Sequence, residues 1–191
     1  MQEETYISIV SPVYQGELLI ELLVRRIINC VEPLTNAFEI ILINDGSTDN
    51  SEIIIQQIAA IDKRIKGIFL DKNYGQHNAL LCGLNFSNGK YIITIDDDLE
   101  QKPEDIELLY NQIRAQKLDL LYGMPNNIKK NIFRKLLTKV YKKISQIENK
   151  KAGEGSSFRI FTKELKENLL IHEGSLFFLD EIALWYTDNI G

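Results

Sequence analysis

Short apolar runs rich in β-branched residues alternate with longer amphipathic segments along this chain. The short runs are apolar on both faces, which is typical of strands buried on both sides of a parallel sheet: Tyr6–Val10, Phe38–Ile43, Lys66–Leu70, Tyr91–Ile95 and Leu118–Tyr122. The longer segments have helical spacing: Glu17–Cys30, Ser51–Ile61, Asn78–Phe86 and Pro103–Ala115. Strands alternating with helices imply right-handed crossovers. The pattern therefore predicts an α/β fold with three layers, α/β/α, around a mostly parallel central sheet.

Composition narrows the class of protein. The chain has 191 residues, of which 45% are hydrophobic and 26% charged, as expected for one globular domain with a full core. Cys30 and Cys82 lie in apolar stretches without a CxxC spacing, which argues against a disulfide scaffold or a zinc finger and suits a reducing compartment. No apolar run approaches a spanning helix, and the N-terminus lacks the features of a signal peptide, so we expect neither in this chain.

Polar residues gather directly after the predicted strands. The first four strands are followed by Ser11–Tyr14, Asn44–Asp49, Asp71–Gln76 and Asp96–Glu100. In open α/β sheets, ligands bind outside the carboxyl ends of the strands. The sequence therefore predicts a ligand site at this edge of the sheet.

The acidic run Asp96-Asp97-Asp98 carries the most chemistry at this edge. Three adjacent carboxylates at the end of a buried strand repel one another, and desolvation adds to the cost. A hard divalent cation, Mg²⁺ or Mn²⁺, held by one or two carboxylates and a diphosphate, relieves both effects. The alternative is a solvated loop that caps the helix near Pro103. For Asp45 the residues leave two interpretations open, turn chemistry or recognition of a nucleobase or ribose.

Four segments in order resemble a known family. PVY, INDGSTDNS, KNYGQHNALLCGL and IDDDLEQKPEDI are similar to family-2 glycosyltransferases of the GT-A fold, most of all to the branch of dolichyl-phosphate mannose synthase and bacterial polyprenyl-phosphate glycosyltransferases. The resemblance extends from Tyr6 to Phe161. Each motif is weak alone, but four in order at matching spacing are specific. No P-loop, dinucleotide-binding glycine motif or GxSxG elbow competes with this interpretation.

The resemblance implies an inverting, metal-dependent glycosyltransferase. It implies transfer of a sugar from a UDP or GDP sugar to a polyprenyl phosphate or a cell-envelope glycan, with Mg²⁺ or Mn²⁺ on the diphosphate. Carried over by motif, the nucleotide-sugar-binding residues are Pro12, Tyr14, Ile43, Asp45, Asp96 and Asp97. The metal ligands carried over are Asp96, Asp98 and Glu100.

The chain departs from the family pattern around this site. Gln15-Gly16 stands where the family has Asn-Glu, so a ribose-facing carboxylate is missing unless Glu17 substitutes. Asn44 replaces the first aspartate of Asp-Asp-Gly, and Asp97 replaces the neutral middle residue of Asp-Ala-Asp. These changes leave the donor open and retain the metal site.

Two further candidates lie on the acceptor side. Gly153–Phe161 is similar to the family's acceptor segment, in which Arg159 would bind an acceptor phosphate or form a structural ion pair. A lipid phosphate needs no strong base, whereas a sugar hydroxyl would need a carboxylate. Asp180, with Glu181 beside it, is the candidate base, and the alternative is the solvated face of an apolar helix.

The net charge of −5 conceals a basic segment. Residues 127–151 contain nine Lys or Arg and one acid, a net of +8, so the rest of the chain carries −13. Their apolar residues fall at helical spacing, and a basic amphipathic helix is typical of contact with an anionic membrane surface, or of packing on the core. It lacks the interleaved exposed aromatics expected of a nucleic-acid binder. We therefore expect a cytoplasmic protein that is peripheral or anchored at the inner face of the membrane.

The domain organisation follows from length and resemblance. We expect residues 1–191 to form a single catalytic domain, truncated before the acceptor loop and membrane helices with which relatives of this branch continue. A non-catalytic nucleotide-sugar-binding scaffold is the alternative function. The sequence leaves open the sugar and the oligomeric state, including a homo-oligomer.

Overall fold

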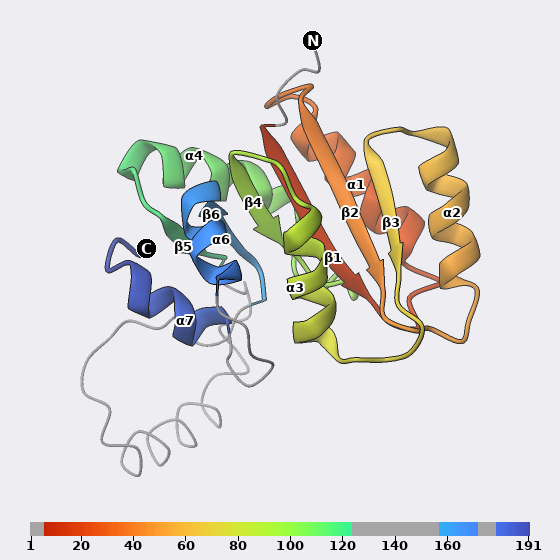
Figure 1. Cartoon of the computed structure of the whole chain (residues 1–191). Helices are drawn as coiled ribbons and strands as arrows, with labels where there is room; N and C mark the ends of the chain where they lie inside the picture. The colour runs from red at the N-terminus through yellow and green to blue at the C-terminus, as the bar shows by residue number, and fades with distance from the viewer. Residues whose placement is uncertain (1–5, 124–156, 172–178) are drawn as a thin grey trace, which may run out of the picture.

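The computed structural model describes residues 6–123, 157–171 and 179–191 (Figure 1). The basic segment 127–151 lies outside the described residues. Its helix and its membrane contact therefore stay predictions.

The described residues form one six-stranded sheet with helices on both sides. The strands are β1 (Ile7–Val13), β2 (Phe38–Asn44), β3 (Ile65–Phe69), β4 (Tyr91–Thr94), β5 (Leu120–Tyr122) and β6 (Arg159–Thr162). The helices are α1 (Ile20–Val31), α2 (Ser51–Ile61), α3 (Gln76–Phe86), the 3-10 turn η1 (Pro103–Asp105), α4 (Ile106–Gln116), α6 (Lys163–Leu170) and α7 (Leu179–Tyr186). The strand order is β3-β2-β1-β4-β6-β5, and β1 to β4 pair in parallel.

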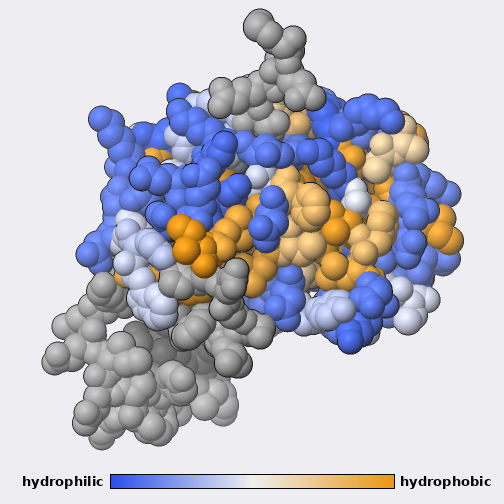
Figure 2. Space-filling view, viewed as in Figure 1, coloured by the Kyte–Doolittle hydropathy of each residue, from blue (hydrophilic) through white to orange (hydrophobic). Residues whose placement is uncertain are grey.

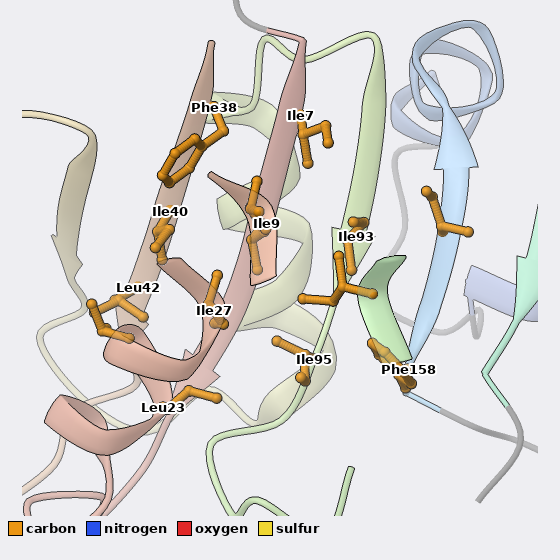
Figure 3. Close-up of a cluster of buried hydrophobic side chains, with 14 of the residues drawn as sticks. Ile7, Ile9, Leu23, Ile27, Phe38, Ile40, Leu42, Ile93, Ile95 and Phe158 are labelled. Atoms are coloured by element: carbon orange, nitrogen blue, oxygen red, sulfur yellow. The ribbon is translucent and has the colours of Figure 1, made fainter. Parts of the chain in front are cut away.

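Helices cover both faces of the sheet and confirm the predicted α/β/α layers. α1, α2 and α4 share one apolar cluster with one face of the sheet, and α3, α6 and α7 share a second cluster with the other face. Leu23 and Ile27 of α1 belong to the first cluster together with Ile9 and Ile40 of the sheet, and Figure 3 shows Ile27 beside Ile9 and Ile40. This spacing of apolar residues along α1 is the amphipathic pattern expected of a surface helix.

The face that carries α3 leaves apolar side chains partly exposed at its β3 side. Ile68, Leu70 and Leu81 are only partly buried there, and Figure 2 shows apolar side chains reaching the surface on this face. α3 packs closely where Gly83 meets the sheet, because a Cβ at Gly83 would lie 2.5 Å from side-chain carbons of Ile43 and Val10. This close approach brings the beginning of α3 to the carboxyl ends of the strands.

The strand β6 and the helix α6 were not predicted from the sequence. β6 is antiparallel to both β4 and β5 and separates them. Its short run, Arg-Ile-Phe-Thr, begins with an arginine that is only 4% exposed, so it lacks the continuous apolar signal of the other strands. α6, which follows it directly, is short and largely polar in sequence.

Two element boundaries differ from prediction for local reasons. β1 continues past Val10 to Val13 and includes Pro12, because β4 stops pairing with β1 at Val10 while β2 continues to pair. A proline is tolerated where no neighbouring strand needs its N–H. α1 begins at Ile20, not at Glu17, because the backbone N–H groups of Gln15 to Glu17 donate to side chains of the β2–α2 loop and of Ser51 at the beginning of α2.

Within the described ranges, none of the helices combines the length and the apolar character needed to cross a membrane.

Candidate active site

A pocket of about 260 Å³ opens at the carboxyl ends of β1, β2 and β4, beside the beginning of α3. Most of the residues named from the sequence for nucleotide and metal binding line it. The lining residues are Pro12, Val13, Tyr14, Asp45, Asn73, Gly75, Gln76, Asp96, Asp97 and Asp98. The structure therefore brings together polar groups from four separate strand ends.

Asp45 fastens the wall of the pocket formed by the β3–α3 loop. Its side chain is 2% exposed, and its Oδ1 and Oδ2 accept hydrogen bonds from the backbone N–H groups of Tyr74 (2.7 Å) and Gly75 (2.9 Å). Gly46 lies against the same loop with φ +63°, and a Cβ there would be 2.3 Å from the carbonyl carbon of Lys72. Asp45 thus holds the loop in place at the point where the pocket begins.

Asp96 is surrounded by hydrogen-bond donors. Its Oδ1 accepts from Nε2 of Gln76 at 2.5 Å, and its Oδ2 accepts from Nε2 of Gln101 at 3.0 Å and from the hydroxyl of Ser157. Burial raises the pKa of Asp96, the nearby Asp98 charge adds to this, and the hydrogen bonds from Ser157 and Gln101 oppose it. Both carboxylate oxygens are engaged by the protein.

Asp97 reaches back toward β1. Its Oδ2 accepts a hydrogen bond from the backbone N–H of Tyr14 at 3.2 Å. Burial raises the pKa of Asp97 to about 6, and the charges of Asp98 and Asp96 act in the same direction. The site therefore holds a carboxylate whose charge is disfavoured by its surroundings.

Asp98 is the most exposed of the three carboxylates. Its Oδ1 accepts from the backbone N–H of Glu100 at 2.9 Å, and its side chain lines the pocket. No three His, Cys, Asp or Glu side chains in the described part of the chain form a closed metal site. One accessible carboxylate nevertheless fits Mg²⁺ or Mn²⁺, which commonly take one or two protein carboxylates and complete their shell with diphosphate and water.

Two residues carried over from the family motifs lie outside the pocket lining. Ile43 is fully buried in the core against Gly83, so its side chain does not reach the pocket. Glu100 is exposed and outside the pocket lining, because the chain turns through Leu99 at φ +58°. Gln101, the next residue, faces Asp96 in its place.

Glu17 does not supply the carboxylate that Gly16 lacks. Its Oε2 accepts from the backbone N–H of Asn50 at 2.9 Å and from the Asn50 side chain at 2.8 Å, at the beginning of α2. Asn44 is also structural, since its Oδ1 accepts from the backbone N–H of Ser47 at 3.2 Å. Both residues shape the β2–α2 loop.

Arg159 and Asp180 form an ion pair outside the main pocket. Nε of Arg159 donates to Oγ1 of Thr94 at 3.2 Å, and the hydroxyl of Tyr122 donates to Asp180 at 2.9 Å. Burial, together with the Asp180 charge, raises the pKa of Tyr122. Of the two interpretations of Arg159, the structure shows the ion pair, and Asp180, the candidate base, is the partner in that pair. The Glu181 side chain lies outside the described residues.

Sequence reasoning missed the neutral polar residues of the site. Gln76, Gln101 and Ser157 all bond Asp96, and Asn73 lines the pocket. Gln76 and Asn73 do follow a strand end, which is the signal that could have found them. Ser157 is 61 residues from Asp96, so only the position of β6 in the sheet brings it there.

Solved structures share this fold. S. aureus TarS in complex with UDP-GlcNAc superposes with a TM-score of 0.65 over 97% of this chain and 55% of that one, at 17% identity. The mannosyltransferase PcManGT from Pyrobaculum calidifontis, in complex with GDP-Man and Mn²⁺, gives a TM-score of 0.63 over 88% of this chain and 47% of that one, also at 17% identity. At such identities the likeness shows the fold, and both folds are of the GT-A type.

Curated relatives share sequence as well. The undecaprenyl-phosphate 4-deoxy-4-formamido-L-arabinose transferase of Photorhabdus laumondii is 35% identical over 175 residues, which are 90% of this chain and 54% of that protein. This chain spans about half the length of the curated relatives it matches. The family described as Glycosyl transferase family 2 matches residues 8–173. With most of its length covered by that match, the chain belongs to glycosyl transferase family 2.

Proposed function

We propose that this chain is the catalytic domain of an inverting glycosyltransferase that uses a nucleoside diphosphate sugar, a divalent metal and a polyprenyl phosphate acceptor. The observation that carries the proposal is the convergence of Asp45, Asp96, Asp97 and Asp98 on one pocket at the strand ends. The names of the curated relatives support the acceptor class.

Different residues of the pocket would contact the nucleoside and the diphosphate of the donor. Pro12 and Tyr14 line the wall where a nucleoside would lie, and Tyr14 is 51% exposed, so its ring is available to a base. Asp98 would hold Mg²⁺ or Mn²⁺ on the diphosphate. Asp96 is held by Gln76, Gln101 and Ser157 at the same edge, which keeps the turn that carries Asp98 in one position.

A bound metal would neutralise the charge that develops as the nucleoside diphosphate leaves. The remaining task of this chain is to orient the donor so that an acceptor can approach the opposite face of the sugar. A lipid phosphate is already ionised near neutral pH, so the acceptor itself supplies the attacking oxygen. This suits a site in which Asp180 is paired with Arg159.

Two alternatives remain as outcomes of experiment. A saccharide acceptor would need a carboxylate base, and a non-catalytic scaffold would bind a nucleotide sugar without transfer. A polyprenyl phosphate acceptor would also place the full protein at the inner face of the membrane, with residues 127–151 as the proposed contact.

Calorimetric titration of UDP and GDP, each with and without Mn²⁺, tests the donor site. We expect one of them to bind in a Mn²⁺-dependent way, and Asp98→Asn to remove that dependence. Glu52→Gln is the matched control, since Glu52 is an exposed acid on α2, away from the pocket. Binding of neither nucleotide would refute the proposal.

Transfer of a labelled sugar to undecaprenyl phosphate by the full-length protein tests the reaction. Product with a lipid phosphate and none with a free glycan supports the proposed acceptor. Binding without any transfer favours the scaffold.

A further inference from the structure

The loop after β1 is held by side chains along four consecutive residues. Each backbone N–H of this loop donates to an oxygen from another part of the chain. The pairs are Tyr14 with Oδ2 of Asp97 at 3.2 Å, Gln15 with Oγ of Ser47 at 3.0 Å, Gly16 with Oγ of Ser51 at 3.0 Å and Glu17 with Oδ2 of Asp49 at 3.1 Å. Three acceptors belong to the β2–α2 region, and the fourth belongs to the turn that carries the three aspartates.

Gly16 is matched to the side chain of Asp97. A Cβ at Gly16 would lie 2.7 Å from Oδ2 of Asp97 and 3.0 Å from Cγ1 of Val13. A separation of 2.7 Å is closer than a carbon and an oxygen can approach without displacement. The carboxylate of Asp97 therefore occupies the space that any side chain at position 16 would need.

The position of the Asp97 side chain matters for Tyr14, because the same carboxylate accepts a hydrogen bond from the backbone N–H of Tyr14. The residue lines the pocket and is 51% exposed, so neighbouring residues do not enclose its side chain. The position of the ring then depends on its backbone, and Asp97 holds the N–H of that backbone. In contrast, Asp98 points into the pocket and is the accessible carboxylate.

We propose that Asp97 is a positioning residue for the nucleoside half of the donor, which acts by holding the Tyr14 backbone, with Gly16 as the residue that makes room for it. The inference rests on the proposed donor site. It assigns neighbouring aspartates to different halves of one ligand, Asp98 to the metal and diphosphate and Asp97 to the nucleoside.

The two halves can be tested separately. Pyrophosphate with Mn²⁺ reports the diphosphate half, and UDP or GDP with Mn²⁺, whichever binds the wild type, reports both halves. We expect Asp97→Ala to weaken nucleotide binding by about tenfold, the size of one lost hydrogen bond at the upper end of the usual range, and to leave pyrophosphate binding within about twofold.

Two further variants distinguish positioning of the Tyr14 backbone by Asp97 from a direct effect of the Asp97 charge and from misfolding. Asp97→Asn keeps an oxygen that can accept from Tyr14, so it should bind nucleotide within about threefold of the wild type. Gly16→Ala should displace the Asp97 side chain and weaken nucleotide binding as Asp97→Ala does. The double variant Gly16→Ala, Asp97→Ala should be no weaker than Asp97→Ala alone, because both changes remove the same contact.

Several results would overturn the inference. If Asp97→Asn loses as much nucleotide affinity as Asp97→Ala, the ligand interacts directly with the negative charge of Asp97. If pyrophosphate binding falls together with nucleotide binding, Asp97 belongs to the metal half. If wild type binds nucleotide and Asp97→Ala binds it equally well, only this inference fails. If wild type binds neither UDP nor GDP, the proposed function fails and this inference with it.

Discussion

The two ends of the sheet differ in whether their acidic side chains have a cationic partner: Glu39 is paired with Lys66, whereas the three adjacent aspartates form no ion pair with another described residue. At the amino ends of the strands, Glu39 is 3% exposed and is surrounded by donors. Oγ of Ser8 donates to it at 2.6 Å, Nζ of Lys66 at 2.6 Å and the backbone N–H of Asn88 at 2.7 Å. At the carboxyl ends, Asp96, Asp97 and Asp98 lie side by side without an ion pair to Lys or Arg among the described residues.

This difference indicates a structural role for Glu39 and a functional role for the three aspartates. A buried carboxylate that has a cation and hydrogen-bond donors contributes to a defined fold, and breaking such a set is costly. Burial and neighbouring negative charge raise the pKa values of Asp96 and Asp97, and carboxylates with pKa values perturbed in this way are common at functional sites. Three substitutions test this contrast, and they are ordered by the size of the effect we expect.

Glu39→Ala should have the largest effect, on stability. The change leaves the hydroxyl of Ser8, the N–H of Asn88 and the Lys66 ammonium without their acceptor, so we expect the free energy of unfolding to fall by about 3 kcal/mol. Urea denaturation monitored by circular dichroism measures it. Nucleotide affinity of the folded fraction should be unchanged, and a loss of affinity would contradict the separation of the two clusters.

Asp98→Asn should have a slightly smaller effect, on binding. Loss of the proposed metal ligand should weaken Mn²⁺-dependent nucleotide binding by about 100-fold, equivalent to about 2.7 kcal/mol. The free energy of unfolding without metal should stay within about 0.5 kcal/mol of wild type, because the side chain is exposed. A variant that unfolds more easily and still binds Mn²⁺ normally would reverse the assignment.

Asp97→Asn should have the smallest effect and the opposite sign, a gain of about 1 kcal/mol in stability without metal at pH 7.5, after allowance for solvent screening. A carboxyl group whose pKa is raised by folding, here to about 6, binds more protons in the folded than in the unfolded chain. Wild-type stability should therefore fall as pH rises from about 4 to about 7, and less so in the variant. Thermal unfolding across this pH range measures the difference, and equal slopes would contradict it.

Much of this fold could be predicted from the pattern of apolar residues. β1 and β2 are buried along seven residues each, and β3 and β4 are shorter runs rich in apolar residues, so each stands out from its surroundings. β6 does not stand out in the sequence, because its first residue is a buried arginine whose charge is balanced by Asp180 from α7. A single sequence does not show that a charged residue has a distant partner.

The candidate site divides in the same way. Asp45, Asp96 and Asp98 could be named because acidic residues at strand ends suggest a cation or a nucleotide. Ile43 was placed in the site by motif alone, and the packing of α3 at Gly83 puts its side chain in the core instead. Gln101 was not identified from the sequence. Its hydrogen bond to Asp96 depends on the backbone turn at Leu99, which the sequence does not show.

The position of β6 has a consequence for how the protein is made. During synthesis β4 emerges long before β6, so its outer edge stays open until a segment more than sixty residues later in sequence arrives to pair with it. Pairings between such distant segments form slowly, and an open strand edge attracts other chains in the meantime. Ser157 reaches Asp96 only with that last pairing. We therefore expect the nascent chain to complete the part of its sheet around β1 to β3 first and the hydrogen bonds that hold Asp96 last.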